Sequence, residues 1–547
     1  MKKYINKISA AALMMAVAAT TVSCSSDYLD TNPTSSVGSS QALGSTEFGM
    51  KALNGIASSM STQQYMFSQG FCGENYIMNK MECYPSQNYL YNYYAAGWAP
   101  LINAEWNDRT NSSYNAYGWY YYYNLIGQAN SIICNIDAAT GTDEEKAFVK
   151  ASALTFRAYA YEKLCHYYCV RWQDSQNGAA DGLVLQLDET TNGKPRATMA
   201  ETYAQIYKDC DEAISLFKQS GMDREAGEVW IANENVAHAV YARAALTKQD
   251  YSKALEQAKL AENGYPLMTN AEYQAGFCNP TSEWIFGSYG SANENNWYWS
   301  YGTQYSCNGY YATNQPTGAG AIGRELINRI PNNDARKALF LTEDKFPDHD
   351  WSPANKDPYL QTYCIMGMTD DELWEEVYEY IQSMTPSGLE PAYQSEYFYL
   401  GGHLKFWVFD TPGVGYLPFI RTSEMVLIEA EANYFLNNAD AAQKALVKLN
   451  AESGRNPEYT CSKTGQDLFD EIKDYRELEL WGECSWSDYK RWNLPVVRKT
   501  FAQGGNSHAA AAVTIPANGA NNWTWGIPQS EYDYNDCIGV NGKNVTE

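Results

Sequence analysis

The sequence predicts a mainly α-helical protein, in which pairs of helices form a scaffold for a loop-rich, irregular remainder. Apolar residues recur at intervals of three and four over several long stretches, the spacing of one helix face. By contrast, residues 63–118 and 273–420 are rich in Gly, Asn, Pro and aromatic residues and show little sustained periodicity, apart from helix candidates at 321–340 and 371–384. Long irregular segments usually carry function, so these two are where we expect a site.

The N-terminus has the pattern of a lipoprotein signal peptide. A Lys-rich start is followed by an apolar stretch that is too short to span a bilayer, and then by Cys24. We expect cleavage before Cys24, which makes residues 1–23 the signal peptide, and lipidation of Cys24. Thr21 departs from the usual Leu, so a plain secretory peptide is the alternative.

The segment behind Cys24 is predicted to leave the membrane as a tether. Residues 24–50 are rich in Ser, Thr, Gly and Asn. The Ser and Asp residues directly after Cys24 resemble the signal that sends bacterial lipoproteins to the outside of the outer membrane. We therefore expect a lipid-anchored protein of the outer membrane that faces the cell exterior.

Aromatic residues are unusually common: 45 Tyr, 16 Trp and 17 Phe. This is more aromatic surface than a core of this size needs, so some of it should be exposed for binding. The densest run, residues 119–123, reads WYYYY. As a helix it places one apolar set on a single face, namely Trp119, Tyr122, Tyr123, Ile126 and Ile133. The run is therefore interpreted mostly as core, with Tyr120 and Tyr121 pointing elsewhere.

Four further stretches have helical patterns. Residues 143–170 repeat small and aromatic side chains, and residues 198–218 open with Thr198 and Glu201, the two residues of a capping box. Residues 234–262 and 423–452 each divide into two helices with Ala at the close-packing positions. Their spacing resembles tetratricopeptide repeats.

Composition and motifs argue against several functions. The formal net charge of −25 disfavours nucleic acid and polyanionic ligands. Twelve of the 13 cysteines follow Cys24 without metal-ligand spacing, and Cys165, His166 and Cys169 lack further ligands nearby, so buried apolar cysteines are expected. We expect no metal and no cofactor. No nucleophile elbow, HExxH or P-loop motif occurs, and we expect no enzyme activity.

Ordered motifs resemble the SusD/RagB family. They include DYLDTNP at 27–33, DYRELELWGECSWSDYKRWN at 474–493 and GIPQSEYDYN at 526–535. The second departs from the family pattern at Asp474, Ser485 and Tyr489. Its DYKRWN end is interpreted as structural, with Asp488 pairing with Arg491 and Trp492 closing the core, in preference to an anion or sugar clamp.

The resemblance implies a cell-surface lipoprotein that captures oligo- or polysaccharide and delivers it to a SusC-like TonB-dependent transporter. It also implies a SusD-like N-terminal part at 51–272 and a C-terminal part at 273–547. Peptide binding and a purely structural repeat adaptor are the alternatives, with a glycoside hydrolase less favoured. The transporter, a glycan and the N-terminal lipid are the expected partners, and nucleic acid is not.

Two loop stretches combine aromatic faces with amide edges, the groups that stack on sugar rings and bond their hydroxyls. The first spans residues 93–115 and the second spans residues 291–311. In the second, the aromatic residues alternate as on one face of an extended segment; a buried strand is the alternative. The predicted glycan-binding residues are Trp98, Asn103, Trp106, Asn295, Trp297, Trp299 and Tyr301.

Overall fold

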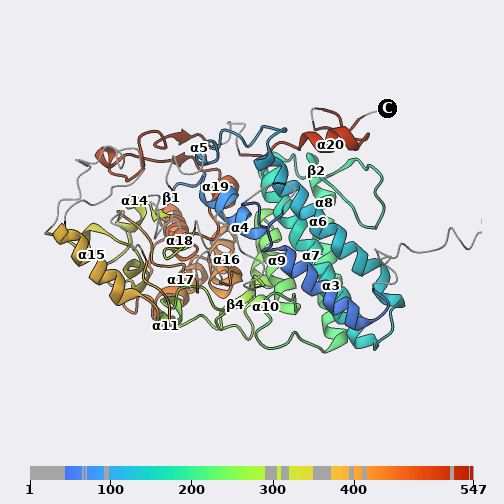
Figure 1. Cartoon of the computed structure of the whole chain (residues 1–547), viewed down its shortest axis with the longest axis horizontal. Helices are drawn as coiled ribbons and strands as arrows, with labels where there is room; N and C mark the ends of the chain where they lie inside the picture. Colours follow the sequence, from blue (N-terminus) through green and yellow to red (C-terminus); the bar gives the residue numbers. More distant parts are fainter. Residues whose placement is uncertain are drawn as a thin grey trace, which may run out of the picture.

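The computed structural model describes residues 43–64, 67, 70–91, 98–289, 305–309, 320–348, 371–392, 400–409, 415–517, 523–540 and 542–545. Helices dominate these residues, and the mainly α-helical prediction is confirmed (Figure 1). Within them, no helix is long and apolar enough to cross a membrane.

One end of the molecule is a stack of helices that follow one another in sequence and pack on their neighbours (Figure 1). Capping boxes start two of them, at Thr142 with Glu145 and at Thr198 with Glu201, and the second confirms the prediction. The stack comprises α3 (Thr46–Ser59), α6 (Ser113–Asn135), α7 (Asp143–Tyr168), α8 (Met199–Ser220), α9 (Glu234–Thr247) and α10 (Tyr251–Ala261).

A second helical group packs on this stack through α10 and α16. Buried alanines on both helices, Ala254, Ala258 and Ala430 among them, allow the close approach. The turns at 247–250 and 437–438 lie where the sequence predicts them, and Gln249 and Asn437 adopt positive φ there. The group comprises α16 (Thr422–Phe435), α17 (Ala439–Val447), the π-helical turn Lys448–Glu452, α18 (Gly465–Glu479) and α19 (Trp486–Trp492).

The remaining elements are short. The helix expected at 371–384 is confirmed as α15 (Asp371–Met384), but the one expected at 321–340 is wrong as a continuous helix. That segment forms α14 (Arg324–Ile327) and a 3-10 turn, Ala335–Leu339, because Pro331 between them cannot donate a helical hydrogen bond. The other helical pieces are α4 (Glu74–Tyr76), the π-helical turn Ile77–Cys83, α5 (Ala99–Ile102), α11 (Asn270–Tyr273), α20 (Gln529–Tyr534), and the 3-10 turns Ile136–Ala138, Trp172–Asp174, Glu343–Lys345 and Phe501–Gln503.

Strands of the described residues form two-stranded antiparallel ribbons that tie distant segments together. They pair β1 (Tyr89–Leu90) with β5 (Ala321–Ile322), β2 (Asp181–Val184) with β3 (Arg196–Thr198), β4 (Trp284–Gly287) with β6 (Pro418–Arg421), and β7 (Val496–Val497) with β8 (Thr514–Ile515). One hydrophobic core runs through both predicted parts of the chain, and the boundary at 272–273 stays a prediction.

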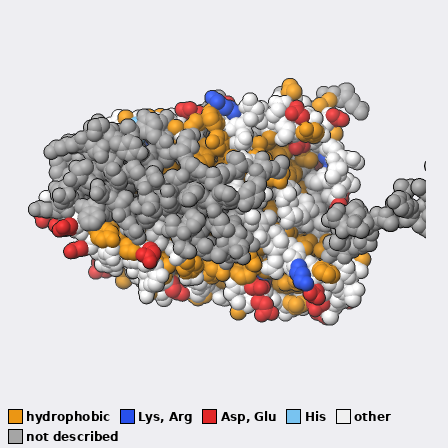
Figure 2. Space-filling model, in the orientation of Figure 1, with side chains coloured by type: hydrophobic (Ala, Val, Ile, Leu, Met, Phe, Trp, Pro, Cys, Tyr) orange, Lys and Arg blue, Asp and Glu red, His pale blue; other side chains and the backbone are white. Residues whose placement is uncertain are grey.

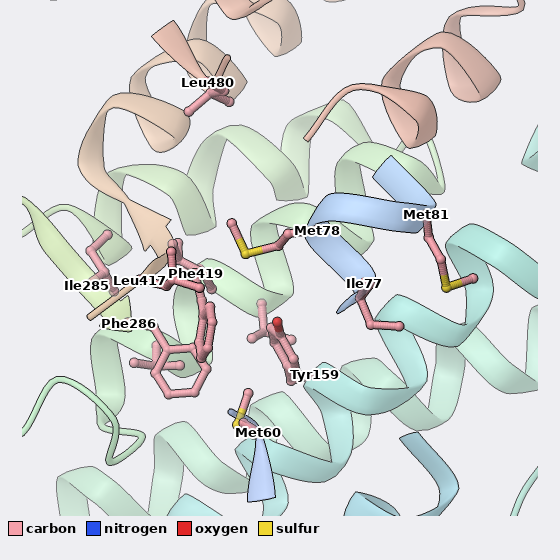
Figure 3. Packing of buried hydrophobic residues seen from close by; sticks show 14 of the residues in the cluster. Met60, Ile77, Met78, Met81, Tyr159, Ile285, Phe286, Leu417, Phe419 and Leu480 are labelled. Carbon is pink, nitrogen blue, oxygen red and sulfur yellow. The ribbon is translucent and has the colours of Figure 1, made fainter. Parts of the chain in front are cut away.

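The core joins the helical stack to the β4–β6 ribbon. Tyr159 of α7 lies beside Phe286 of β4, with ring centroids 5.7 Å apart, and Phe286 lies 5.5 Å from Phe419 of β6 (Figure 3). Met60 and Met78 fill the space around them. Cys165 and Cys169 are buried and unbridged, as expected.

A fully buried network of charges lies under α18. Glu479 receives three guanidinium groups, with its oxygens 3.0 Å from Arg336, 3.1 Å from Arg421 and 3.0 Å from Arg455. Burial opposes ionisation, but the three arginines hold the pKa of Glu479 well below its usual range. An ion in this network has no water to replace a lost partner, so the network is intolerant of single substitutions.

The DYKRWN segment is also structural. Asp488 binds Arg476 at 2.6 Å and Arg491 at 2.7 Å, which confirms the predicted pairing. Trp492 is only half-buried, and its indole Nε1 donates to Glu431 at 3.1 Å. These contacts join α19 to α18 and α16.

The aromatic run lies on α6 as predicted, with one correction. Trp119 and Tyr122 are buried, whereas Tyr120 is half-exposed and points away from the core, as expected. Tyr121, which was expected to point away with Tyr120, is 2% exposed. The prediction was wrong for Tyr121 because α6 is covered on more than one side, and Tyr121 packs on Tyr117 and Tyr122 there.

Candidate ligand-binding site

Trp98 and Asn103 lie in the core. Trp98 is 4% exposed, and its ring packs against Tyr114 with Lys80 Nζ 4.4 Å from its centroid. Asn103 is 9% exposed; it donates to the Ala510 carbonyl at 3.1 Å and accepts from Arg498 at 3.1 Å. Both side chains are therefore buried and engaged in contacts within the protein. The composition of the loop gives no sign of this burial.

Trp106 lies at the surface end of the same segment. It is half-buried, stacks on Tyr114 at 5.4 Å and carries the Arg109 guanidinium 4.9 Å from its ring centroid. The other predicted contacts and the lipidation site lie outside the described residues, namely Asn295, Trp297, Trp299, Tyr301 and Cys24. That these residues bind a glycan or a lipid stays a prediction.

Aromatic rings continue from Trp106 in a connected series to the first turns of α6, which we call the aromatic arc. Its members are Trp106, Tyr114, Phe71, Phe67 and Tyr120. Successive ring centroids lie 5.4, 5.9, 5.7 and 4.8 Å apart. Phe71, in the middle of the series, is buried, and the other four rings are half-buried. Rings in this state keep part of a face open while their positions are fixed by packing.

The arc ends at a cleft of about 800 Å³, which we call the α6 cleft. Three segments form its walls: the start of α6, the loop between β2 and β3, and the segment that contains α20. Figure 1 shows α20 near β2 at one end of the molecule. The lining residues are Phe67, 110–113, Ala116, Trp119, Tyr120, Tyr123, Asn124, Val184, Gln186, 190–194, 528–531, Tyr534 and Asn535.

Backbone hydrogen bonds hold the α20 wall against the loop that carries Trp106. The amide of Gly526 donates to the Asn107 carbonyl at 2.8 Å, and that of Gln529 donates to the Thr110 carbonyl at 2.8 Å. On the other side, Asn535 Nδ2 donates to the Lys194 carbonyl at 2.9 Å. The arc and the cleft are thus parts of one framework.

Close approach of two walls requires glycine at one position. A Cβ atom on Gly193 would stand 2.6 Å from Asn535 Oδ1, inside contact distance. The opposite side of the loop is fixed by Tyr123, whose hydroxyl donates to the Val184 carbonyl at 2.9 Å and accepts from the Val184 amide at 3.0 Å. The width of the cleft is therefore set by specific contacts.

Most of the residues that line the α6 cleft are polar, but few of them carry a charge. Lys194 and Glu531 are the charged side chains among the lining residues that the structure describes. Lys194 pairs with Asp188 at 3.2 Å. Glu531 accepts from the Trp119 indole at 3.0 Å and from Asn535 Nδ2 at 2.6 Å. Hydroxyl and amide groups of Ser, Thr, Asn and Gln make up most of the rest, together with Tyr534, which is 87% exposed.

This arrangement suits a ligand with apolar faces and many hydroxyl groups. Half-exposed rings can stack on C–H faces, and amide groups can both donate to and accept from hydroxyls. Hydrolysis of a glycosidic bond requires two carboxyl groups across the bond, and the described lining residues contain one.

Of the residues that form the arc and the cleft, Trp106 and Tyr120 stand out in the sequence, and that either binds a ligand stays a prediction. Tyr120 had a signal, because it falls outside the apolar face of α6. Phe67, Gln186 and Tyr534 carry no such signal in the sequence. They meet in the cleft only because of long-range hydrogen bonds, from residue 529 to residue 110 and from residue 535 to residue 194. In the sequence, the segment 526–535 stands out only as part of a family motif.

Two family models match successive parts of the chain. One, described as starch-binding associating with outer membrane, matches residues 27–246. The other, described as the SusD family, matches residues 282–539. A search of curated proteins finds no significant match.

Solved structures share the fold. A SusD-like carbohydrate binding protein from Bacteroides vulgatus is 21% identical, with 92% of this chain and 99% of that chain covered and a TM-score of 0.70. A SusD superfamily protein from Bacteroides vulgatus is 20% identical over 92% and 100% of the two chains, with a TM-score of 0.68. One from Bacteroides thetaiotaomicron is 22% identical over 90% and 98%, with a TM-score of 0.65. With both family models matched in order, the chain belongs to the SusD/RagB family.

Proposed function

We propose that this protein is a cell-surface lipoprotein that binds a glycan along the aromatic arc and in the α6 cleft. The observation that carries the proposal is the continuity of the two features: half-buried rings, connected through the buried Phe71, lead from Trp106 to Tyr120, and Tyr120 lines a hydroxyl- and amide-rich cleft. Family membership supports it, and so does the similarity in fold to a SusD-like carbohydrate binding protein from Bacteroides vulgatus.

Binding proceeds by stacking and hydrogen bonding, with no bond broken in the ligand. Sugar rings lie with their C–H faces on Trp106, Tyr114 and Tyr120, whose positions are fixed by neighbouring rings. Hydroxyl groups donate to and accept from the amides and hydroxyls of the cleft. Because these groups are already in place, little conformational freedom is lost when the ligand binds.

Delivery to a SusC-like TonB-dependent transporter in the outer membrane completes the proposed function. A lipid on Cys24 holds the protein at the membrane and residues 24–50 act as the tether, so the bound glycan stays close to its transporter. Asn295, Trp297, Trp299 and Tyr301 are proposed as further glycan contacts. The protein itself is proposed to have no enzyme activity, cofactor or metal.

A glycan panel tests the proposal directly. Purified protein without the signal peptide is screened by glycan array, and retained glycans are measured by affinity electrophoresis or calorimetry. Trp106→Ala and Tyr120→Ala should each weaken binding at least severalfold, since stacking on one ring contributes about 0.5–1.5 kcal/mol beyond its buried area.

Phe435→Ala is the matched control, because Phe435 is also partly exposed but lies on α16 in a separate aromatic cluster. It should leave glycan binding unchanged. Retention of peptides with no retention of any glycan would replace the proposal by peptide binding, and new reducing ends from incubated glycans would show a hydrolase.

A further inference from the structure

Of the two charged side chains that line the α6 cleft in the described part of the chain, Lys194 is paired with an opposite charge and Glu531 is not. Lys194 is paired with Asp188, both of whose oxygens lie 3.2 Å from its Nζ. Glu531 receives only neutral donors, the Trp119 indole and the Asn535 amide. Among the described residues, no cation lies within ion-pair distance of Glu531, so its negative charge is uncompensated locally.

Glu531 also has acceptor capacity left. An ionised carboxylate offers about four lone-pair positions, and the two neutral donors occupy one on each oxygen. A ligand hydroxyl can donate to the remaining positions. A carboxylate or sulfate ester on the ligand cannot donate, and its charge would be repelled at the same place.

The surroundings of the cleft reinforce this repulsion. Glu189 lies in the β2–β3 loop, which forms one wall of the cleft, whereas Asp188 in the same loop is neutralised by Lys194. The whole chain carries a formal net charge of −25, and Figure 2 shows acidic side chains outnumbering basic ones on the visible described surface. The negative charge of the surrounding surface therefore adds to the repulsion of an anionic ligand at Glu531.

We infer that the α6 cleft selects uncharged glycans, with Glu531 as the specificity-determining residue that accepts from ligand hydroxyls and rejects anionic sugars. This inference rests on the proposed function and adds the substrate class: neutral oligosaccharides, as opposed to those that carry uronic acids or sulfate esters. The role of Glu531 is to discriminate between ligands, in addition to holding Trp119.

The test uses one ligand in two charge states. A neutral oligosaccharide retained in the glycan panel is compared with its C6-oxidised counterpart, in which primary hydroxyl groups have become carboxylates. Calorimetry at about 20 mM and about 500 mM salt should show the oxidised form binding the unmodified protein at least tenfold more weakly, with a smaller difference at high salt because screening weakens the repulsion.

Glu531→Gln keeps an acceptor for Trp119 and removes the charge, so it should bring the two affinities several times closer together. Asp533→Asn is the matched control: it removes a neighbouring exposed charge that does not line the cleft, and it should leave the ratio nearly unchanged. Thermal melting checks that both variants fold.

The outcomes separate the two claims. Neutral glycans that bind while their oxidised forms bind equally well would overturn the charge selection and leave the proposed function standing. An affinity ratio that Glu531→Gln does not alter would overturn the role of Glu531. Absence of binding by every glycan of the panel, charged or neutral, would overturn the proposed function and this inference together.

Discussion

The indole Nε1 of Trp119 donates a 3.0 Å hydrogen bond to Oε2 of Glu531, a residue 412 positions later in the chain. Trp119 belongs to the first turns of α6 and Glu531 to α20, so the bond joins two walls of the α6 cleft. Trp119, a residue of the densest aromatic run, therefore both packs in the core and links two walls of the candidate site.

Trp119→Phe should lower glycan affinity in the cleft as well as the stability of the fold. A smaller benzene ring replaces the buried indole, and Glu531 loses one donor; hydrogen bonds to charged groups contribute about 1.5–3 kcal/mol. We expect a loss of about 1–3 kcal/mol in the free energy of unfolding by urea, together with several times weaker glycan binding.

The control for this change is Trp230→Phe. The indole of Trp230 donates to Asn54 at 2.9 Å, a neutral acceptor that does not line the cleft. Its removal should lower stability by about 1 kcal/mol and leave glycan affinity unaltered. Equal effects of the two substitutions on glycan affinity would contradict the role given to Trp119.

Tyr120 and Tyr121 should respond to alanine in opposite ways. Tyr121→Ala removes a buried ring and should lower the free energy of unfolding by about 3–5 kcal/mol. Tyr120→Ala removes a half-exposed ring of the aromatic arc and should affect glycan binding more than stability. Urea titration and affinity electrophoresis of both variants measure the contrast; a large stability loss at Tyr120 would place it in the core instead.

Glu479→Ala should be among the most destabilising single substitutions. It would leave Arg336, Arg421 and Arg455 buried without their shared carboxylate, and breaking a buried pair by removing one partner costs about 3–5 kcal/mol. Lys444→Ala breaks the exposed pair with Asp440 and should change stability by less than about 0.5 kcal/mol. Chemical denaturation of both variants compares the two cases.

Glu477 should make stability depend on pH near neutrality. Burial raises the pKa of its carboxyl to about 7, although Tyr489 and Asn88 donate to it. The folded state thus holds a proton that the unfolded state releases near its ordinary pKa of 4.5. This contribution is complete below pH 4.5 and is lost as pH rises through 7, a change of about 3 kcal/mol.

Glu477→Gln removes that titration without changing the shape of the side chain. The difference in unfolding free energy between the variant and the unmodified protein should therefore change in favour of the variant between pH 5 and pH 8. A difference that stays constant over this range would show that the carboxyl titrates at its ordinary pKa in the folded protein.

The fold was predictable where a pattern is local. Periodic apolar residues located α7, α8 and the two helix pairs, and Thr198 with Glu201 marked a helix start. The prediction for Tyr121 was wrong because a helical face describes contact with one neighbour, whereas α6 is covered on more than one side. Pro331 is a local signal for a break in the helix expected at 321–340, although the helical pattern of that segment runs across it.

The candidate site was less predictable, since its walls come from distant segments. Aromatic and amide composition indicates the loop around Trp106 but does not distinguish the half-buried Trp106 from the buried Trp98, and glycan binding by Trp106 stays a prediction. Nothing local links Gln186 or Tyr534 to Tyr120. Their meeting depends on hydrogen bonds such as that of Gln529 to Thr110, which only the assembled fold supplies.

Ligand binding in the α6 cleft requires the wall that contains α20 to be in place. The aromatic arc lies within residues 67–120, but the cleft closes only when residues 526–535 have docked. Contacts of such large sequence separation form late and slowly. A variant in which residues 526–535 fail to dock should therefore lose the cleft even where the helical stack has folded.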